Sequence, residues 1–273
     1  MRGKSYVVAV MRKPDKTLHM EYDKLQGIYI SRWAKIPLLR GLVILWDSLY
    51  LGMKFITKSA NLQAEEDAKI EGPVLYFSLL LSITFAIGLF FILPTFIIEL
   101  FTRIWKLTPF LMNLLEGLVR LIILIAYIWV IGQMKDIARV FAYHGAEHKI
   151  INAYEQGIEI TVENVKDYPL AHPRCGTSFL LSLVFLSIIM FTLIGPLPLA
   201  VRILSRIAFV PFIAMFAYEF IRWMSDHLEN PVVKLLTYPN LLLQKLTTRE
   251  PSPDMLEVAI SSFKKLLQLE QSE

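Results

Sequence analysis

The fold is decided by the stretch at residues 110–134, FLMNLLEGLVRLIILIAYIWVIGQM, in which Glu116 and Arg120 are the only charged residues. About 20 consecutive, predominantly apolar residues are enough for an α-helix to cross the hydrocarbon core of a bilayer. This stretch is therefore predicted to span a membrane. Charges inside a span need partners, and Glu116 and Arg120 lie four residues apart, so a self-contained ion pair is expected.

Three further apolar blocks occur, at residues 73–100, 177–199 and 203–224. Pro94 is expected to kink the first, and a short turn at 195–198 separates the other two. The chain has 273 residues, of which 55% are apolar, and its mean hydropathy of +0.50 is too high for an ordinary soluble domain. The predicted fold is a mainly α, polytopic membrane helix bundle with about four spans in two hairpins.

The basic residues predict the orientation of the spans. Of the 28 Lys and Arg residues, 1–72 hold twelve, 135–177 hold five and 222–273 hold six, whereas the other two loops hold only four. By the positive-inside rule, both termini and the central loop face the cytoplasm. We therefore read the net charge of +4 as a topology signal, with the lipid bilayer as partner and no nucleic acid.

Two segments before the first span are predicted to form secondary structure. Residues 5–12 and 17–23 read as strands, and the proline and aspartate in 13–16 favour a tight turn, which predicts a β-hairpin. Residues 36–58 are helical and apolar, but Asp47 interrupts them before a span is complete. This helix is predicted to lie in the membrane interface or to re-enter the membrane.

The C-terminal tail is predicted to contain an amphipathic helix that opens at Ser252 and Pro253. Its apolar stripe needs a cover, and the hairpin, the central loop and this tail can form one cytoplasmic lobe. The predicted segments are an N-terminal cytoplasmic β-hairpin at 1–35, an interfacial or re-entrant helix at 36–72, a first transmembrane hairpin at 73–134, a cytoplasmic loop at 135–177, a second transmembrane hairpin at 178–224 and a cytoplasmic amphipathic tail at 225–273.

The central loop begins with the motif His144-Gly145-Ala146-Glu147-His148. On a helix, residues four apart share one face, so His144 and His148 can bind one metal ion, and Glu147 projects about 60° away, near enough to act as the base on a metal-bound water. The order H-x-x-E-H is that of the inverted zinc-peptidase motif. The alternative is a pair of core histidines bonded to the backbone or to Tyr154 and Glu155.

The same loop ends with His172 and Cys175. Together with the two helical histidines they make four donors that suit tetrahedral zinc. If three bind, the open position can hold a water; if four bind, the zinc is structural. Cys175 has two other interpretations, a nucleophilic thiolate activated by Arg174 and a helix N-terminus, or a small buried residue.

Three more residues, Glu155, Arg174 and Glu219, are predicted to surround the ligands without binding the ion. For Glu219 the alternative is an ion pair with Arg222, three residues on.

Four short motifs occur together in this chain: YHGAEHK at 143–149, NAYE at 152–155, HPRCGTS at 172–178 and LTTREP at 246–251. In this combination the chain resembles the YqhQ family of bacterial membrane proteins over nearly its whole length. The resemblance implies a bacterial cytoplasmic membrane and a metal-dependent enzyme activity, with neither substrate nor reaction named. The family pattern opens with a Gly-Gln-Ala-Val-Met-Glu-Gly-Val-Met-Met-Arg-Gly-like segment, and Met1-Arg2-Gly3 matches its end.

Three functions are compatible with these observations. The leading hypothesis is a metal-dependent hydrolase at the cytoplasmic face, acting on a membrane protein or lipid through zinc and Glu147. The second is a non-enzymatic membrane factor that binds a protein or lipid through the helix at 36–58 and the tail, with the metal site structural. The third is a homo-oligomeric transporter or channel, suggested by the charges inside spans.

Overall fold

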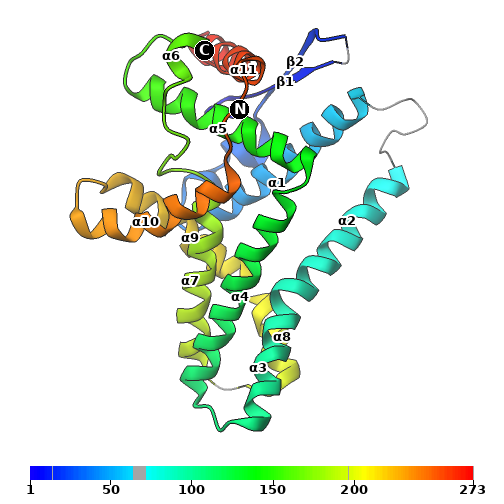
Figure 1. Ribbon diagram of the computed structural model, residues 1–273, viewed down its shortest axis with the longest axis vertical. Coiled ribbons are helices and arrows are strands. Elements are labelled where there is room, and N and C mark those ends of the chain that lie inside the picture. Colours follow the sequence, from blue (N-terminus) through cyan, green and yellow to red (C-terminus); the bar gives the residue numbers. More distant parts are fainter. Residues whose placement is uncertain (14, 64–71, 196, 273) are drawn as a thin grey trace.

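The computed structural model describes residues 1–13, 15–63, 72–195 and 197–272 (Figure 1). Within them the chain is mainly helical with one small sheet, as predicted. The elements in chain order are β1 (Tyr6–Arg12), β2 (Leu18–Lys24), the 3-10 helices η1 (Gly27–Ile30) and η2 (Arg32–Lys35), α1 (Leu39–Gln63), α2 (Gly72–Ile87), the π-helix η4 (Gly88–Ile92), α3 (Leu93–Ile104), α4 (Pro109–Ile131), α5 (Lys135–Glu155), α6 (Val162–Val165), α7 (Thr177–Ile194), α8 (Leu199–Ala208), α9 (Val210–Asp226), α10 (Pro231–Thr247) and α11 (Pro253–Gln271).

Three helical stretches among the described residues are long and apolar enough to cross a membrane. They are Gly72–Ile104, which joins α2, η4 and α3, then α4, and α7. Helices α8 and α9 pass the same test together, although the chain bends by 46° between them. The predicted fold class, a helical membrane protein with about four spans and a small hairpin, is thereby confirmed.

The first span is interrupted at the proline that the sequence singled out. The break is the π-helix η4, which lies directly before Pro94. Because proline has no N–H, Pro94 cannot donate to the carbonyl of Phe90, four residues earlier. Arg120 of α4 donates to that carbonyl through Nε at 2.9 Å, so the irregular turn is joined to the neighbouring span.

The pair of Glu116 and Arg120 forms as predicted, with 2.9 Å between Oε1 and Nη2, but the expectation that it would be self-contained is wrong. Arg206 of α8 also donates to Glu116 Oε1, through Nε at 2.9 Å, and binds Asn113 Oδ1 at 2.7 Å. The spacing within α4 could not show this, because α8 is brought to α4 only by the packing of the bundle.

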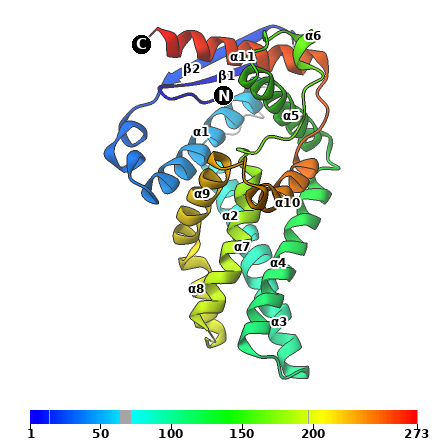
Figure 2. The same ribbon diagram turned by 90° about the vertical axis from the view of Figure 1, so that its left-hand side faces the viewer.

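Both termini lie at the end of the molecule that carries α5 and α11 (Figures 1 and 2). There β1 and β2 pair antiparallel from Tyr6↔Lys24 to Arg12↔Leu18, which confirms the hairpin; of its predicted turn, Pro14 lies outside the described residues. We call β1, β2, α5, α6 and α11 the lobe. The Glu270 carboxylate of α11 accepts the backbone N–H groups of Ser5 and Tyr6, at 2.8 and 3.0 Å, and so ties the hairpin to the tail.

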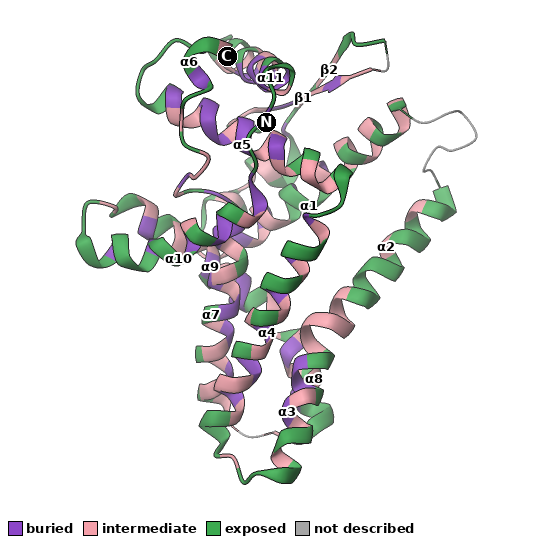
Figure 3. Ribbon diagram, in the orientation of Figure 1, coloured by how far each residue is buried: buried purple, intermediate pink, exposed green. Residues whose placement is uncertain are grey.

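The apolar stripe of α11 forms the core of the lobe, which Figure 3 shows as buried segments on α5 and α11. Leu256, Ala259, Ile260 and Phe263 are buried there with residues of α5 and α6, among them Ile150. A stripe that is covered inside the chain is not a free binding face. The apolar stripe of α11 therefore stabilises the lobe.

Helix α1 has one face on protein and one exposed apolar face. Its Asp47 is fully buried and pairs with Arg2, and burial raises the pKa of this carboxyl above its ordinary value against the opposing effect of Arg2. Trp46, Leu49 and Tyr50 are more than half exposed. Exposed aromatic and aliphatic side chains beside a bundle of spans are typical of a helix at a membrane surface.

Gly117 lies where α4 packs closely against α7, so the bundle is expected to require a glycine at this position. A Cβ on Gly117 would lie 2.1 Å from Ile188 Cγ1, whereas a Cβ on Gly88 would meet nothing within 4 Å. Gly117→Ala is therefore expected to destabilise the purified protein by about 1–3 kcal/mol through overpacking, and Ile188→Ala in the same chain should recover part of the loss. Thermal unfolding in detergent measures both; equal melting temperatures for Gly117→Ala and the control Gly88→Ala would contradict the packing.

Candidate functional site

Helix α5 carries the H-x-x-E-H motif across the end of the bundle (Figure 1). The motif lies on a helix separate from the second span, since α4 ends at Ile131 and α5 begins at Lys135. Gly132 permits the turn because a Cβ there would come within 3.1 Å of the Phe141 ring. The reorientation brings the face of α5 with His144 and His148 toward the loop that precedes α7.

Three of the predicted metal ligands converge. The donor atoms of His144, His148 and Cys175 all lie within 4.8 Å of one another. His144 Nε2 is 3.1 Å from Cys175 Sγ, and the rings of His144 and His148 lie 4.4 Å apart, centroid to centroid. We call these residues the His–His–Cys group. One ion can reach all three donors without a change of fold.

The second nitrogen of each histidine is bound to the backbone. His144 Nδ1 lies 2.9 Å from the carbonyl oxygen of Thr247, and His148 Nδ1 bonds the carbonyl oxygen of Leu170. A carbonyl only accepts, so both rings carry a proton on Nδ1 and turn Nε2 toward the cysteine. Metal-binding histidines usually have this arrangement, in which the outer N–H fixes the ring and the inner nitrogen binds the ion. The backbone bonds also agree with the alternative of core histidines bonded to the backbone, whereas the part of that alternative that invoked Tyr154 and Glu155 does not describe these contacts.

Cys175 is buried directly before α7, and its Sγ accepts the N–H of Thr177 at 3.3 Å. Burial raises the pKa of its thiol, but hydrogen bonds with His144 and His148 outweigh this effect and lower it to about 5. Burial lowers the pKa of His144, but Cys175, the Thr247 carbonyl and Glu147 together outweigh burial and raise this pKa above its ordinary value. The two opposite shifts favour a thiolate beside a protonated imidazole, and a bound metal ion can take the place of the proton between them.

His172 lies beside the His–His–Cys group but outside it. Its ring centroid is 5.9 Å from that of His148, and its Nδ1 accepts the N–H of Arg174 at 3.3 Å. Its Nε2 faces Glu155 Oε2 at 3.4 Å, so both ring nitrogens have partners. Arg174 completes this chain of contacts by pairing with Glu155. Glu155 and Arg174, two of the three residues predicted around the ligands, thus contact His172.

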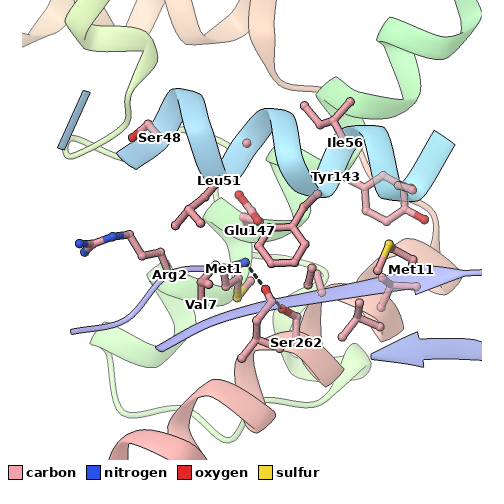
Figure 4. A pocket seen from close by; sticks show the side chains of 18 of the residues that line it. Met1, Arg2, Val7, Met11, Ser48, Leu51, Ile56, Tyr143, Glu147 and Ser262 are labelled. Carbon is pink, nitrogen blue, oxygen red and sulfur yellow. Dashed lines mark hydrogen bonds between the residues drawn. The ribbon is translucent and has the colours of Figure 1, made fainter. Parts of the chain in front are cut away.

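Glu147 projects from α5 into a cavity of about 450 Å³ between β1, α1, α5 and α11 (Figure 4). Tyr143, one turn earlier, lines the same cavity, and apolar side chains such as Leu51 and Met11 form much of its wall. The histidines, each one position further along the helix, belong to the neighbouring face. The carboxylate is thus next to the His–His–Cys group in sequence but directed into a separate space.

Glu219 is not part of the site. Its carboxylate pairs with Arg40 at the start of α1, with 2.6 Å between Oε1 and Nε, and it accepts the Leu38 N–H at 3.0 Å. The predicted alternative partner, Arg222, faces Asp226 instead, at 4.0 Å. Glu219 therefore fastens α1 to α9.

The site depends on residues that carried no ligand signal in the sequence. Thr247 supplies a backbone carbonyl, and a Cβ on Gly145 would lie 2.2 Å from the carbonyl oxygen of Arg249, so only glycine lets α5 approach this segment. The buried Lys149 pairs with Glu250 at 2.7 Å. All of these lie in the motifs YHGAEHK and LTTREP, whose joint occurrence was the signal that could have placed them together.

The thiol pKa gives a direct test of the His–His–Cys group. In metal-free protein the rate of alkylation by iodoacetamide should rise with pH around a midpoint of about 5, because the thiolate is the reactive form. His144→Ala should move the midpoint upward, and zinc should slow the reaction. Cys175 is the only cysteine, so all label reports this site. A midpoint near the ordinary value of about 8.5 in the folded protein would contradict the arrangement.

Comparison with known proteins places the chain in a family. The family model described as "Protein of unknown function (DUF1385)" matches residues 36–269. A curated relative, "Uncharacterized protein YqhQ" of Bacillus subtilis (strain 168), is 35% identical over 283 residues, which cover 98% of this chain and 89% of the relative. No solved structure matches. The chain therefore belongs to the YqhQ family, which this match and this relative define.

Proposed function

We propose that this membrane protein binds one zinc ion through His144, His148 and Cys175. The observation that carries the proposal is the pair of Nδ1 to carbonyl hydrogen bonds, which leaves both Nε2 atoms directed at a cysteine of low pKa. Two imidazoles and a thiolate are borderline and soft donors, the set that zinc prefers over magnesium or calcium. Three protein ligands are the usual number in a catalytic zinc site, where the fourth position stays open.

We further propose that the site faces the cytoplasm. Residues 1–72 and 222–273 together hold 18 of the 28 Lys and Arg residues, and these two segments supply β1, β2 and α11 of the lobe. This distribution supports a cytoplasmic lobe by the positive-inside rule.

The activity that this donor set supports best is metal-dependent hydrolysis, with a membrane protein or lipid as substrate. A zinc ion with an open position supplies a water whose pKa is lowered to about 7. His144 and His148 hold the ion in a fixed place because their outer N–H groups are bound to backbone. Glu147 is the proposed base: its carboxylate lines the neighbouring cavity, but it is close enough to His144 to help raise the pKa of that ring. The cavity that it lines offers apolar walls to an acyl chain or a hydrophobic peptide.

Metal analysis tests the ligand set. Wild-type protein purified with zinc is expected to hold one zinc per chain, and His144→Ala, His148→Ala or Cys175→Ala should remove it because each deletes a donor. His172→Ala is the matched control and should keep the metal. X-ray absorption at the zinc edge should show two nitrogen ligands and one sulfur ligand. Loss of zinc in His172→Ala would instead favour a closed, structural site.

Replacing the proposed base tests catalysis separately from binding. Glu147→Gln should retain zinc but lower turnover by about 10²- to 10⁴-fold, the usual contribution of a general base. Because the substrate is unknown, membranes from cells that overproduce wild type, Glu147→Gln and Cys175→Ala should be compared for lipid and peptide products. Products found only with wild type are expected. Equal profiles for wild type and Glu147→Gln would rule out Glu147 as the base.

A second function is favoured by one observation, the exposed apolar face of α1. Trp46, Leu49 and Tyr50 on this face could bind a lipid surface or a membrane partner without any catalysis. In that case zinc would only stabilise the lobe. Polar substitutions of these three residues would then abolish cellular function, and Glu147→Gln would leave it intact.

A further inference from the structure

The bundle contains a buried cluster with more positive than negative charge. Arg120 and Arg206 both bind the single carboxylate of Glu116, each at 2.9 Å. The side chains of all three are at most 7% exposed. Nearby, Arg202 pairs with Glu99 at 2.6 Å, so this second pair neutralises itself and lends no charge to the first. Two guanidinium groups against one carboxylate leave an excess of one positive charge inside the described spans.

The Phe191 ring, whose centroid lies 3.8 Å from Arg206 Cζ, partly stabilises this charge, but no second carboxylate among the described residues balances it. Charges near the middle of a membrane are costly, and they persist where partners or a polar cavity stabilise them. Arg120 uses all of its nitrogens, since it also binds Phe90 O at 2.9 Å and Ser187 Oγ at 3.2 Å. Arg206 does not, because its Nη1 is buried without a hydrogen-bond partner among the described residues. The unused donor and the unbalanced charge belong to the same side chain.

A cavity of about 170 Å³ adjoins this cluster. Arg120, Arg206 and Ser187 line it on one side, and the rest of its wall is aromatic or aliphatic, including Phe90, Leu183 and Leu180. Leu180 is 38% exposed, so the wall extends to the outer surface of α7, where the spans meet lipid. The cavity thus combines a cationic end with an apolar remainder that is continuous with the membrane-facing surface.

We propose that this cavity binds a fatty acid, whose carboxylate accepts a hydrogen bond from Arg206 Nη1 and whose acyl chain lies along the apolar wall. One negative charge balances the cluster. An acyl chain fits walls that would offer a free inorganic ion no further ligands. A carboxylate also suits a small cavity better than the larger head group of a phospholipid. The proposal is independent of the zinc site.

The experiment uses the full-length protein in a non-ionic detergent, with laurate as the fatty acid and methyl laurate as its uncharged analogue. Saturating laurate is expected to raise the melting temperature by roughly 5 °C or more, because a ligand that binds only the folded state stabilises it. Methyl laurate should have no such effect, since it cannot balance the charge. Radiolabelled laurate should bind with a stoichiometry of one per chain.

Arg206→Met removes the excess charge and leaves the neutral pair of Glu116 and Arg120 intact, which favours retention of the fold. Laurate binding should weaken about thirtyfold or more, the effect of deleting one partner of a buried ion pair. The matched control is Arg202→Met on the same helix, which lies outside the cavity and should bind laurate as wild type does.

Leu183→Trp supplies an independent variant if Arg206→Met fails to fold. It fills the cavity while both arginines remain, and it should also abolish laurate binding. The proposal would be overturned by laurate binding of equal strength in wild type and in either cavity variant. Stabilisation by sodium chloride or phosphatidylglycerol but not by laurate, or by methyl laurate as strongly as by laurate, would overturn it as well.

Discussion

The contact between α5 and the segment at 246–251 holds the molecule together. Gly145 lies against the carbonyl of Arg249, Arg249 donates its N–H to Phe141 O at 3.0 Å, and its guanidinium reaches Gly132 O. The same segment supplies the Thr247 carbonyl that orients His144. Since it also connects α10 to α11, one close approach sets the turn after α4, the position of the lobe and the orientation of the His144 ring.

The sequence predicted correctly those features that depend on a single helix or hairpin. The spans follow from the length of apolar blocks, the hairpin from its turn, and the convergence of His144 and His148 from helical spacing. The sequence did not predict the contacts that depend on how helices pack. Glu219 binds Arg40 and Arg206 joins Glu116 because α1 and α8 approach from elsewhere in the chain. The direction of Glu147 likewise depends on which neighbour covers each face of α5.

The molecule contains two buried centres that handle charge in opposite ways. In the His–His–Cys group, thiolate and imidazolium neutralise each other, and the proton between them can be exchanged for a metal ion. In the bundle, the charges of Glu116, Arg120 and Arg206 are buried where solvent cannot screen them. The first centre is balanced without a ligand, whereas the second is balanced only with one. Any ligand at the second centre therefore contributes directly to the stability of the bundle.

Pro94 has a consequence for the biogenesis of the protein. Inside hydrocarbon no water can serve the carbonyl that a proline leaves without its helical donor. The Phe90 carbonyl is bound instead by Arg120, a residue on the next span along the chain. Each of these two helices thus carries a polar group, the Phe90 carbonyl or the Arg120 guanidinium. In lipid this group lacks a hydrogen-bond partner until the other helix is inserted. The first two spans are consequently expected to leave the insertion machinery as a pair, with Phe90 and Arg120 already joined.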